Sequence, residues 1–164
     1  MYDLGRFRQA QDSSPSGLAS ALAELRVGRK TSHWIWYVFP QIAGLGQSPT
    51  AVHYGLAGHD EAAAYLRDPV LGPRLLTAAG IVREQLAAPS PMRLEALMGS
   101  RIDALKLVSS MTLFAQVAKD LHAAEEREDF AAMAEHAEAI LGFAAAQGYE
   151  RCVFTEQHLR QRRT

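Results

Sequence analysis

Apolar residues recur at helical spacing along most of the chain. Three leucines share a face in a segment that would begin at Pro15, after Ser14 as its cap, and end at Gly28. The same spacing predicts further helices at 60–67, from 73 to before Pro89, around 94–97, at 100–119 and from 129 to before Gly148. No segment alternates apolar and polar residues between hairpin turns. The pattern therefore predicts an all-α fold.

The segment at 100–119 differs from the other predicted helices. Ser100 and Asp103 resemble a capping box at its start, and apolar residues cover nearly its whole circumference. We therefore expect this helix to be buried at the centre of the fold. At 164 residues, a single domain over 1–164 is expected, with a C-terminal tail at about 159–164 that frays.

Composition narrows the classes of partner. The net charge is −1, from 17 basic and 18 acidic residues, so no strong field would attract nucleic acid or an anionic membrane. The only cysteine is Cys152, which indicates a reducing compartment. There is neither a signal peptide nor a run of about 18 apolar residues. We expect a cytoplasmic protein, and the sequence does not indicate its oligomeric state.

Candidate chemistry is concentrated in residues 32–41, SHWIWYVFPQ, which contain both tryptophans of the chain. Aromatic faces beside polar groups are typical of a pocket for a flat ligand, and Ser32, Trp34, Trp36 and Gln41 are its candidate binding residues. The alternative is a short core helix, ended by Pro40, whose aromatic residues only pack inward. His33 lies near the start of that helix, where it is suited to contact an anion or to act as an acid or base.

A second polar group falls within the predicted central helix. Asp103, Lys106 and Ser110 share one helical face, and Ser109 and Thr112 lie close to them. These residues are candidates for a cationic, hydroxyl-bearing pocket wall that binds phosphate or ribose. In the alternative, Asp103 and Lys106 form a structural ion pair, and the hydroxyls bond to carbonyls of their own helix. Because buried polar groups need partners, we expect 32–41 to pack near 106–112.

Motifs for established chemistry are absent. The sequence has no phosphate-binding glycine loop, no nucleophile elbow and no zinc-protease motif. Its histidines are scattered and its single cysteine cannot build a structural zinc site. We therefore predict no metal and no cofactor.

Two blocks of residues resemble a known family, the bacterial family called domain of unknown function 1810, whose members are sometimes mislabelled calpastatin. The resemblance spans about 3 to 116, and its motifs are Asp3-Leu4, Arg6-Phe7, Ala10-Gln11, Ser32-His33-Trp34, Trp36, Phe39-Pro40-Gln41, Gly44-Leu45-Gly46, Asp103, Lys106-Leu107 and the run 109–114. The resemblance implies an all-helical domain without an established activity. A more distant likeness to the helical NADAR and YbiA-like group implies an ADP-ribose or N-glycosidic ligand.

Three functions follow as hypotheses. In the first, the protein binds or hydrolyses a nucleotide-like or ribose-phosphate ligand. Trp34 or Trp36 would then stack on the base, Lys106 and Arg6 would hold phosphate, and Asp103 or His33 would polarise water as the catalytic group. In the second, the Trp/Tyr/Phe block is a protein-interaction surface. In the third, the polar residues are structural and no small ligand binds.

Overall fold

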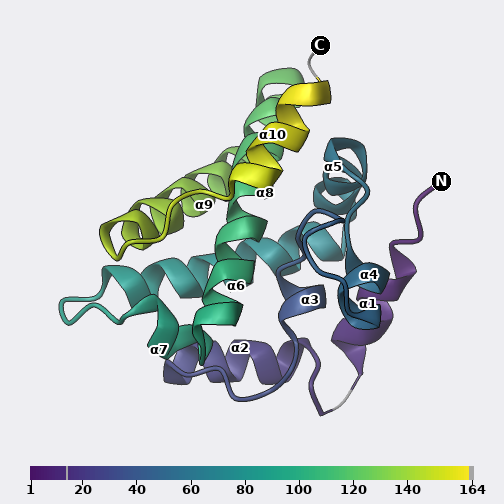
Figure 1. Cartoon of the computed structure of the whole chain (residues 1–164). Coiled ribbons are helices and arrows are strands. Elements are labelled where there is room, and N and C mark those ends of the chain that lie inside the picture. Colours follow the sequence, from purple (N-terminus) through teal and green to yellow (C-terminus); the bar gives the residue numbers. More distant parts are fainter. Residues whose placement is uncertain (14, 163–164) are drawn as a thin grey trace.

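Helices joined by short loops make up the computed structural model, which describes residues 1–13 and 15–162 (Figure 1). In chain order the helices are α1 Gly5–Asp12, α2 Leu18–Val27, α3 Ile35–Val38, α4 Pro49–Tyr54, α5 His59–Arg67, α6 Leu71–Ala87, α7 Leu94–Met98, α8 Arg101–Glu125, α9 Glu128–Ala146 and α10 Val153–Arg162. Within the described residues there is no strand, only an isolated bridge between Ile42 and Leu56. The predicted all-α fold is confirmed.

The long helix α8 lies at the centre, as its apolar pattern predicts. The Ser100 hydroxyl accepts a hydrogen bond from the Asp103 backbone N–H and caps its start. Helix α9 packs along α8, α6 packs against α9, and α5, α7 and α10 also contact α8 (Figure 1). The helix continues past the expected end at 119 because Leu121 is buried, and it ends where Glu126 takes a left-handed conformation.

The burial of α8 is less complete than its sequence predicts. Ile102 and Leu105 are 66% and 44% exposed, near the start of the helix. From Leu107 to Ala115 every residue is buried. The first turns of α8 therefore keep an apolar strip at the surface.

Helix α2 ends at Gly28 as predicted, but it begins at Leu18 instead of Pro15. A side chain on Gly17 would collide with the Gln11 carbonyl oxygen, at 2.5 Å, because the chain leaving α1 passes close by. Ser14, the expected cap, lies outside the described residues.

Three helices have no apolar stripe that reveals them in the sequence. Helix α1 buries only Phe7 and Gln11, and α4 buries no residue at all. Helix α10 covers part of the expected frayed tail, and within it Thr155 and Leu159 are buried. Residues 163–164 of that tail lie outside the described residues.

The segment between Gln41 and Leu56 forms a closed loop on the surface of the bundle. The Ala43 N–H donates to the Leu56 carbonyl at 2.7 Å, and the Leu56 N–H donates to the Gln41 carbonyl at 3.0 Å. The loop carries α4 against α3. It thereby fixes α4 beside the aromatic block.

No helix among the described residues combines the length and the apolar content that crossing a bilayer requires.

Candidate functional site

The carboxylate of Glu24, on α2, organises the beginning of the aromatic block. It accepts hydrogen bonds from the Thr31 N–H at 2.6 Å, the Ser32 N–H at 2.8 Å and the Ser32 hydroxyl at 2.7 Å. It also accepts one from the Trp34 indole N–H at 3.0 Å. The Trp34 ring is completely buried. Ser32 and Trp34 are thus held by a protein carboxylate, which gives both of them a structural partner.

This network makes stability depend on pH. Burial raises the pKa of the Glu24 carboxyl, but the hydrogen bonds from Ser32, Thr31 and Trp34 outweigh it and lower the pKa to about 2, from 4.5. Because the pKa of Glu24 is lower in the folded protein than in the unfolded chain, its ionised carboxylate stabilises the fold at pH values above the unfolded-state pKa. This contribution disappears as pH falls from about 4.5 to about 2.

We expect Glu24→Gln to lower the free energy of unfolding by about 1–3 kcal/mol at pH 7, because charged hydrogen bonds are lost. The difference from wild type should shrink as pH falls from 4.5 towards 2, measured by urea unfolding at several pH values. A difference that stays constant over this range would contradict the assigned role of the carboxylate.

Two lysines and one aspartate connect the aromatic block to α8. The Lys30 ammonium is 2.7 Å from the Asp103 carboxylate, and the Lys106 ammonium is 3.7 Å from the same group. Lys30 is buried, donates to the Ser32 carbonyl at 2.6 Å and lies 5.0 Å from the centre of the Trp34 ring. The Asp103–Lys106 pair of the structural alternative is therefore present, with Lys30 as a third member.

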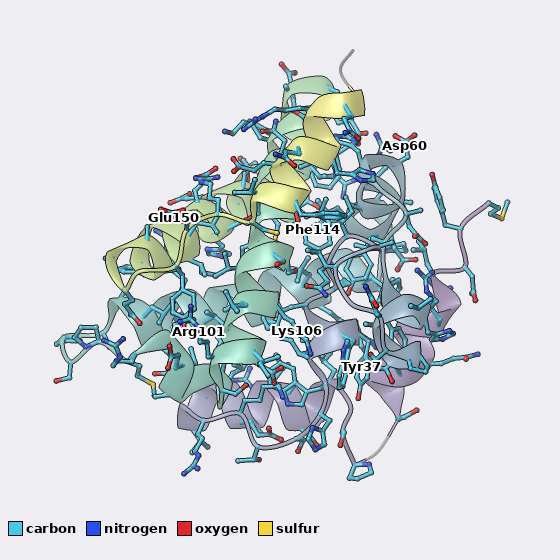
Figure 2. All side chains as sticks on the ribbon, viewed as in Figure 1. Tyr37, Asp60, Arg101, Lys106, Phe114 and Glu150 are labelled. Carbon is cyan, nitrogen blue, oxygen red and sulfur yellow. The ribbon has the colours of Figure 1, made fainter. Side chains whose placement is uncertain are left out.

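The Lys106 ammonium lies over the second tryptophan, 4.6 Å from the centre of the Trp36 ring. Lys106 projects from α8 towards α3, on the side where Tyr37 lies (Figure 2). Beneath this contact is a cavity of about 10 Å³, whose lining includes Trp36, Gln41, Tyr54 and Lys106. The predicted packing of 32–41 against the start of 106–112 is confirmed, but the space has room for about one water molecule.

Two of the three candidate hydroxyls on α8 form hydrogen bonds to carbonyls of their own helix, as the structural alternative expects. The Ser109 hydroxyl donates to the Leu105 carbonyl at 3.0 Å, and the Thr112 hydroxyl donates to the Val108 carbonyl at 2.7 Å. Thr112 also accepts from the Cys152 N–H at 3.1 Å, which ties α10 to α8. The Ser110 hydroxyl is fully buried and has no partner among the described residues.

Arg6 binds protein groups far along the chain from the aromatic block. Its guanidinium donates to the Glu61 carboxylate at 2.9 Å and to the backbone carbonyls of Asp3, His53 and Gly55 at 2.5, 2.8 and 3.1 Å. The side chains of Arg6 and Glu61 are only 12% and 5% exposed. This network joins α1 to the loop before α5.

His33 is exposed, and its side chain forms no hydrogen bond with the part of the chain that the structure describes. It precedes α3 by two residues, and that helix has only four residues. The structure thus brings together Trp36, Gln41, Asp103 and Lys106, and it leaves Arg6 and His33 out of the lining of the small cavity.

Sequence reasoning missed Glu24 and Lys30. Lys30 stands directly before the aromatic block, but its partner Asp103 is distant along the chain. Glu24 lies in the preceding helix and has no motif that distinguishes it from a solvated residue.

Across residues 1–13 and 15–162, no group of three His, Cys, Asp or Glu is arranged to hold a metal ion.

Comparisons with known proteins give a family but no activity. The model of the family described as "Protein of unknown function (DUF1810)" matches residues 1–141. The chain is 40% identical to the conserved hypothetical protein Rv1873 from Mycobacterium tuberculosis, over 88% of this chain and 96% of that one, with a TM-score of 0.66. No curated protein matches.

Proposed function

The chain belongs to the DUF1810 family of proteins of unknown function, and we propose that it binds a flat anionic ligand of the nucleotide or ribose-phosphate class. The observation that carries the proposal is the Lys106 ammonium over the Trp36 ring, 4.6 Å from its centre. We call the surface formed by Trp36, Lys106, Gln41 and Asp103 the Trp36–Lys106 face. All four residues lie within the part of the chain that matches the family model.

Two properties of this face suit such a ligand. The indole of Trp36 is half-buried, so it is held in place while part of its surface stays accessible for stacking on a base. Lys106 is 23% exposed and shares Asp103 with Lys30, so the cluster has two ammonium groups and one carboxylate. The excess positive charge favours a phosphate or carboxylate beside the ring.

The size of the cavity determines how the ligand lies. Because the space beneath Lys106 is about 10 Å³, a base cannot enter it and must rest on the outer surface of Trp36. Lys106 would then move from the ring to the phosphate. In the hydrolytic form of the proposal, Asp103 or His33 polarises water for cleavage of an N-glycosidic bond, and Asp103 is the one adjacent to Lys106.

Replacing Lys106 tests the proposal. We expect Lys106→Gln to weaken binding of AMP or ADP-ribose about 10- to 100-fold, because one charge-assisted contact is lost. The measurement is calorimetric titration of folded protein. Lys119→Gln is the matched control, because Lys119 is an exposed lysine on the same helix, 3.9 Å from Glu138, and its loss should leave binding unchanged.

Two results would overturn this function. One is the absence of binding to AMP, ADP-ribose and riboflavin precursors at millimolar concentration. The other is equal binding by wild type and Lys106→Gln. Release of nicotinamide or free base on incubation would distinguish hydrolysis from binding alone.

The exposed apolar strip on α8 favours a second candidate, a protein-interaction surface. Ile102 and Leu105, 66% and 44% exposed, lie on the turn next to Lys106. Adjacent exposed apolar side chains on one helix are typical of a partner contact. If Ile102→Ser with Leu105→Ser abolishes co-purification of a specific partner while ligand titrations stay empty, this candidate replaces the first.

A further inference from the structure

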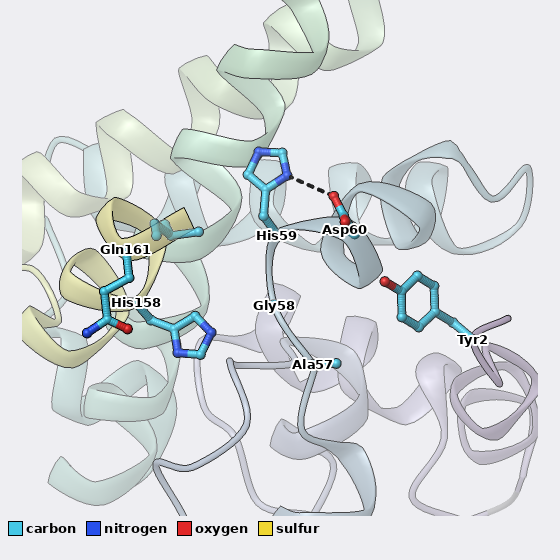
Figure 3. A pocket seen from close by; sticks show the side chains of 8 residues that line it. Tyr2, Ala57, Gly58, His59, Asp60, His158 and Gln161 are labelled. Atoms are coloured by element: carbon cyan, nitrogen blue, oxygen red, sulfur yellow. Dashed lines mark ion pairs between the residues drawn. The ribbon is translucent and has the colours of Figure 1, made fainter. Parts of the chain in front are cut away.

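A cleft of about 370 Å³ opens between the start of α5 and the C-terminal helix α10. Its walls include His59 and Asp60 from α5, His158 and Gln161 from α10, and Tyr2 from the N-terminus (Figure 3). The volume is in the range of sites for small ligands. Asp60 lies well apart from Lys106 in Figure 2, so this is a different site from the Trp36–Lys106 face.

One of its two histidines is fixed by α8. Nε2 of His59 is 2.9 Å from the Asp120 carboxylate, which accepts the hydrogen bond, and Asp120 also accepts one from the Gln116 amide at 2.8 Å. Nδ1 of His59 lies 3.8 Å from the Asp60 carboxylate (Figure 3). The contacts from Gln116 to Asp120 and from Asp120 to His59 therefore set the orientation of the imidazole. Asp60, the next residue along the chain, lies in the wall of the cleft.

The other histidine is available to a ligand. The His158 ring lies 6.3 Å from that of Phe154, and its nitrogens form no hydrogen bond with the described residues. Gly58 separates the two histidines and has φ 153°, a conformation that favours glycine. A Cβ there would lie 3.7 Å from Nε2 of His158, an ordinary van der Waals contact, so the backbone conformation and not lack of space favours glycine at this point.

The groups in the walls select a class of ligand. Asp60 provides a carboxylate, His158 an imidazole, Gln161 an amide and Tyr2 a phenol, so donors and acceptors are mixed. The described residues of the lining include no lysine or arginine, the side chains that most often hold phosphate. Carboxylates and imidazoles form hydrogen bonds readily with the adjacent hydroxyl groups of a polyhydroxy ligand.

We propose that this cleft binds a small neutral polyhydroxy molecule of monosaccharide size, with Asp60 and His158 as its hydrogen-bonding anchors. His59, Asp120 and Gln116 act as positioning residues. The C-terminal helix, which lies beyond the residues matched by the family model, supplies one wall. The site is independent of the function proposed for the Trp36–Lys106 face.

The test is titration of the intact protein with D-glucose, D-ribose and myo-inositol, followed by proton NMR of the six histidines. We expect the His59 and His158 ring signals to shift and the His53 signal, from an exposed residue outside the lining, to stay in place. Asp60→Asn and His158→Ala should each weaken binding about tenfold or more. His53→Ala and Lys106→Gln are controls and should bind as wild type does.

Three results would overturn the proposal. The first is that no histidine signal shifts even at ligand concentrations about 100-fold above 1 mM. The second is that the shifts persist unchanged in both anchor variants. The third is that glucose 6-phosphate binds while glucose does not. Because Lys106→Gln leaves this cleft intact, failure here and failure of the Trp36–Lys106 face are separate outcomes.

Discussion

Trp34→Ala should lower the free energy of unfolding by about 3–5 kcal/mol, the usual cost of removing a large buried aromatic side chain. The Trp34 ring is completely buried, contacts Phe39 with ring centres 6.2 Å apart, and donates its N–H to Glu24. Its removal leaves both a cavity and a carboxylate that lacks one donor. Chemical unfolding monitored by circular dichroism measures the loss.

Trp36→Ala is the matched comparison, since the two tryptophans are two residues apart. Trp36 is only half-buried, and its loss should cost about 1–2 kcal/mol, mainly the burial of part of the ring and the contact with Lys106. Ligand binding should be lost in this variant and not in a folded Trp34 variant. Equal destabilisation by the two substitutions would contradict the division into a structural and a ligand-facing tryptophan.

Arg6→Ala should also destabilise the protein strongly, by about 3–5 kcal/mol, because it leaves the Glu61 carboxylate buried without its partner. A second substitution, Glu61→Gln, made in the same variant should recover part of the loss. Arg8→Ala is the control in the same helix: Arg8 is 39% exposed in its ion pair with Asp68, and its loss should cost less than about 1 kcal/mol.

Thermal and urea unfolding of these variants would measure the effect. A folded Arg6→Ala variant of near wild-type stability that loses ligand binding would show that Arg6 holds phosphate, as the sequence suggested. The structure favours the stability effect, since four protein acceptors already occupy the guanidinium.

The helices that could be predicted are those whose burial is periodic. Helix α8 has a capping serine and a long apolar run, and α2 and α7 end at glycines with φ of 93° and 84°. Helix α10 escaped prediction because, among its residues whose burial the structure describes (153–161), only Thr155 and Leu159 are buried. It is held by tertiary contacts, including the Cys152 N–H on Thr112, and these cannot be inferred from local spacing.

The candidate site shows the same limit. The need of each block for partners predicts that 32–41 packs near 106–112, but it does not predict that Trp36 is the residue that Lys106 contacts. The roles of Glu24 and Lys30 depend on residues brought together by folding, and no spacing rule identifies them. The cleft between α5 and α10 brings together residues from both ends of the chain, Tyr2 and His158. In the sequence, His59 and His158 lie far apart, and no spacing pattern connects them.

The most direct test of the Trp36–Lys106 face uses its own fluorescence. Trp34→Phe leaves Trp36 as the single tryptophan of the protein, so its emission can be followed during titration with AMP and ADP-ribose. We predict saturable quenching that disappears when Lys106→Gln is added, with ribose 5-phosphate quenching far less because it has no base to stack. Unchanged Trp36 emission in a folded variant, with ligand-dependent changes only in the Trp34 signal of Trp36→Phe, would contradict the account.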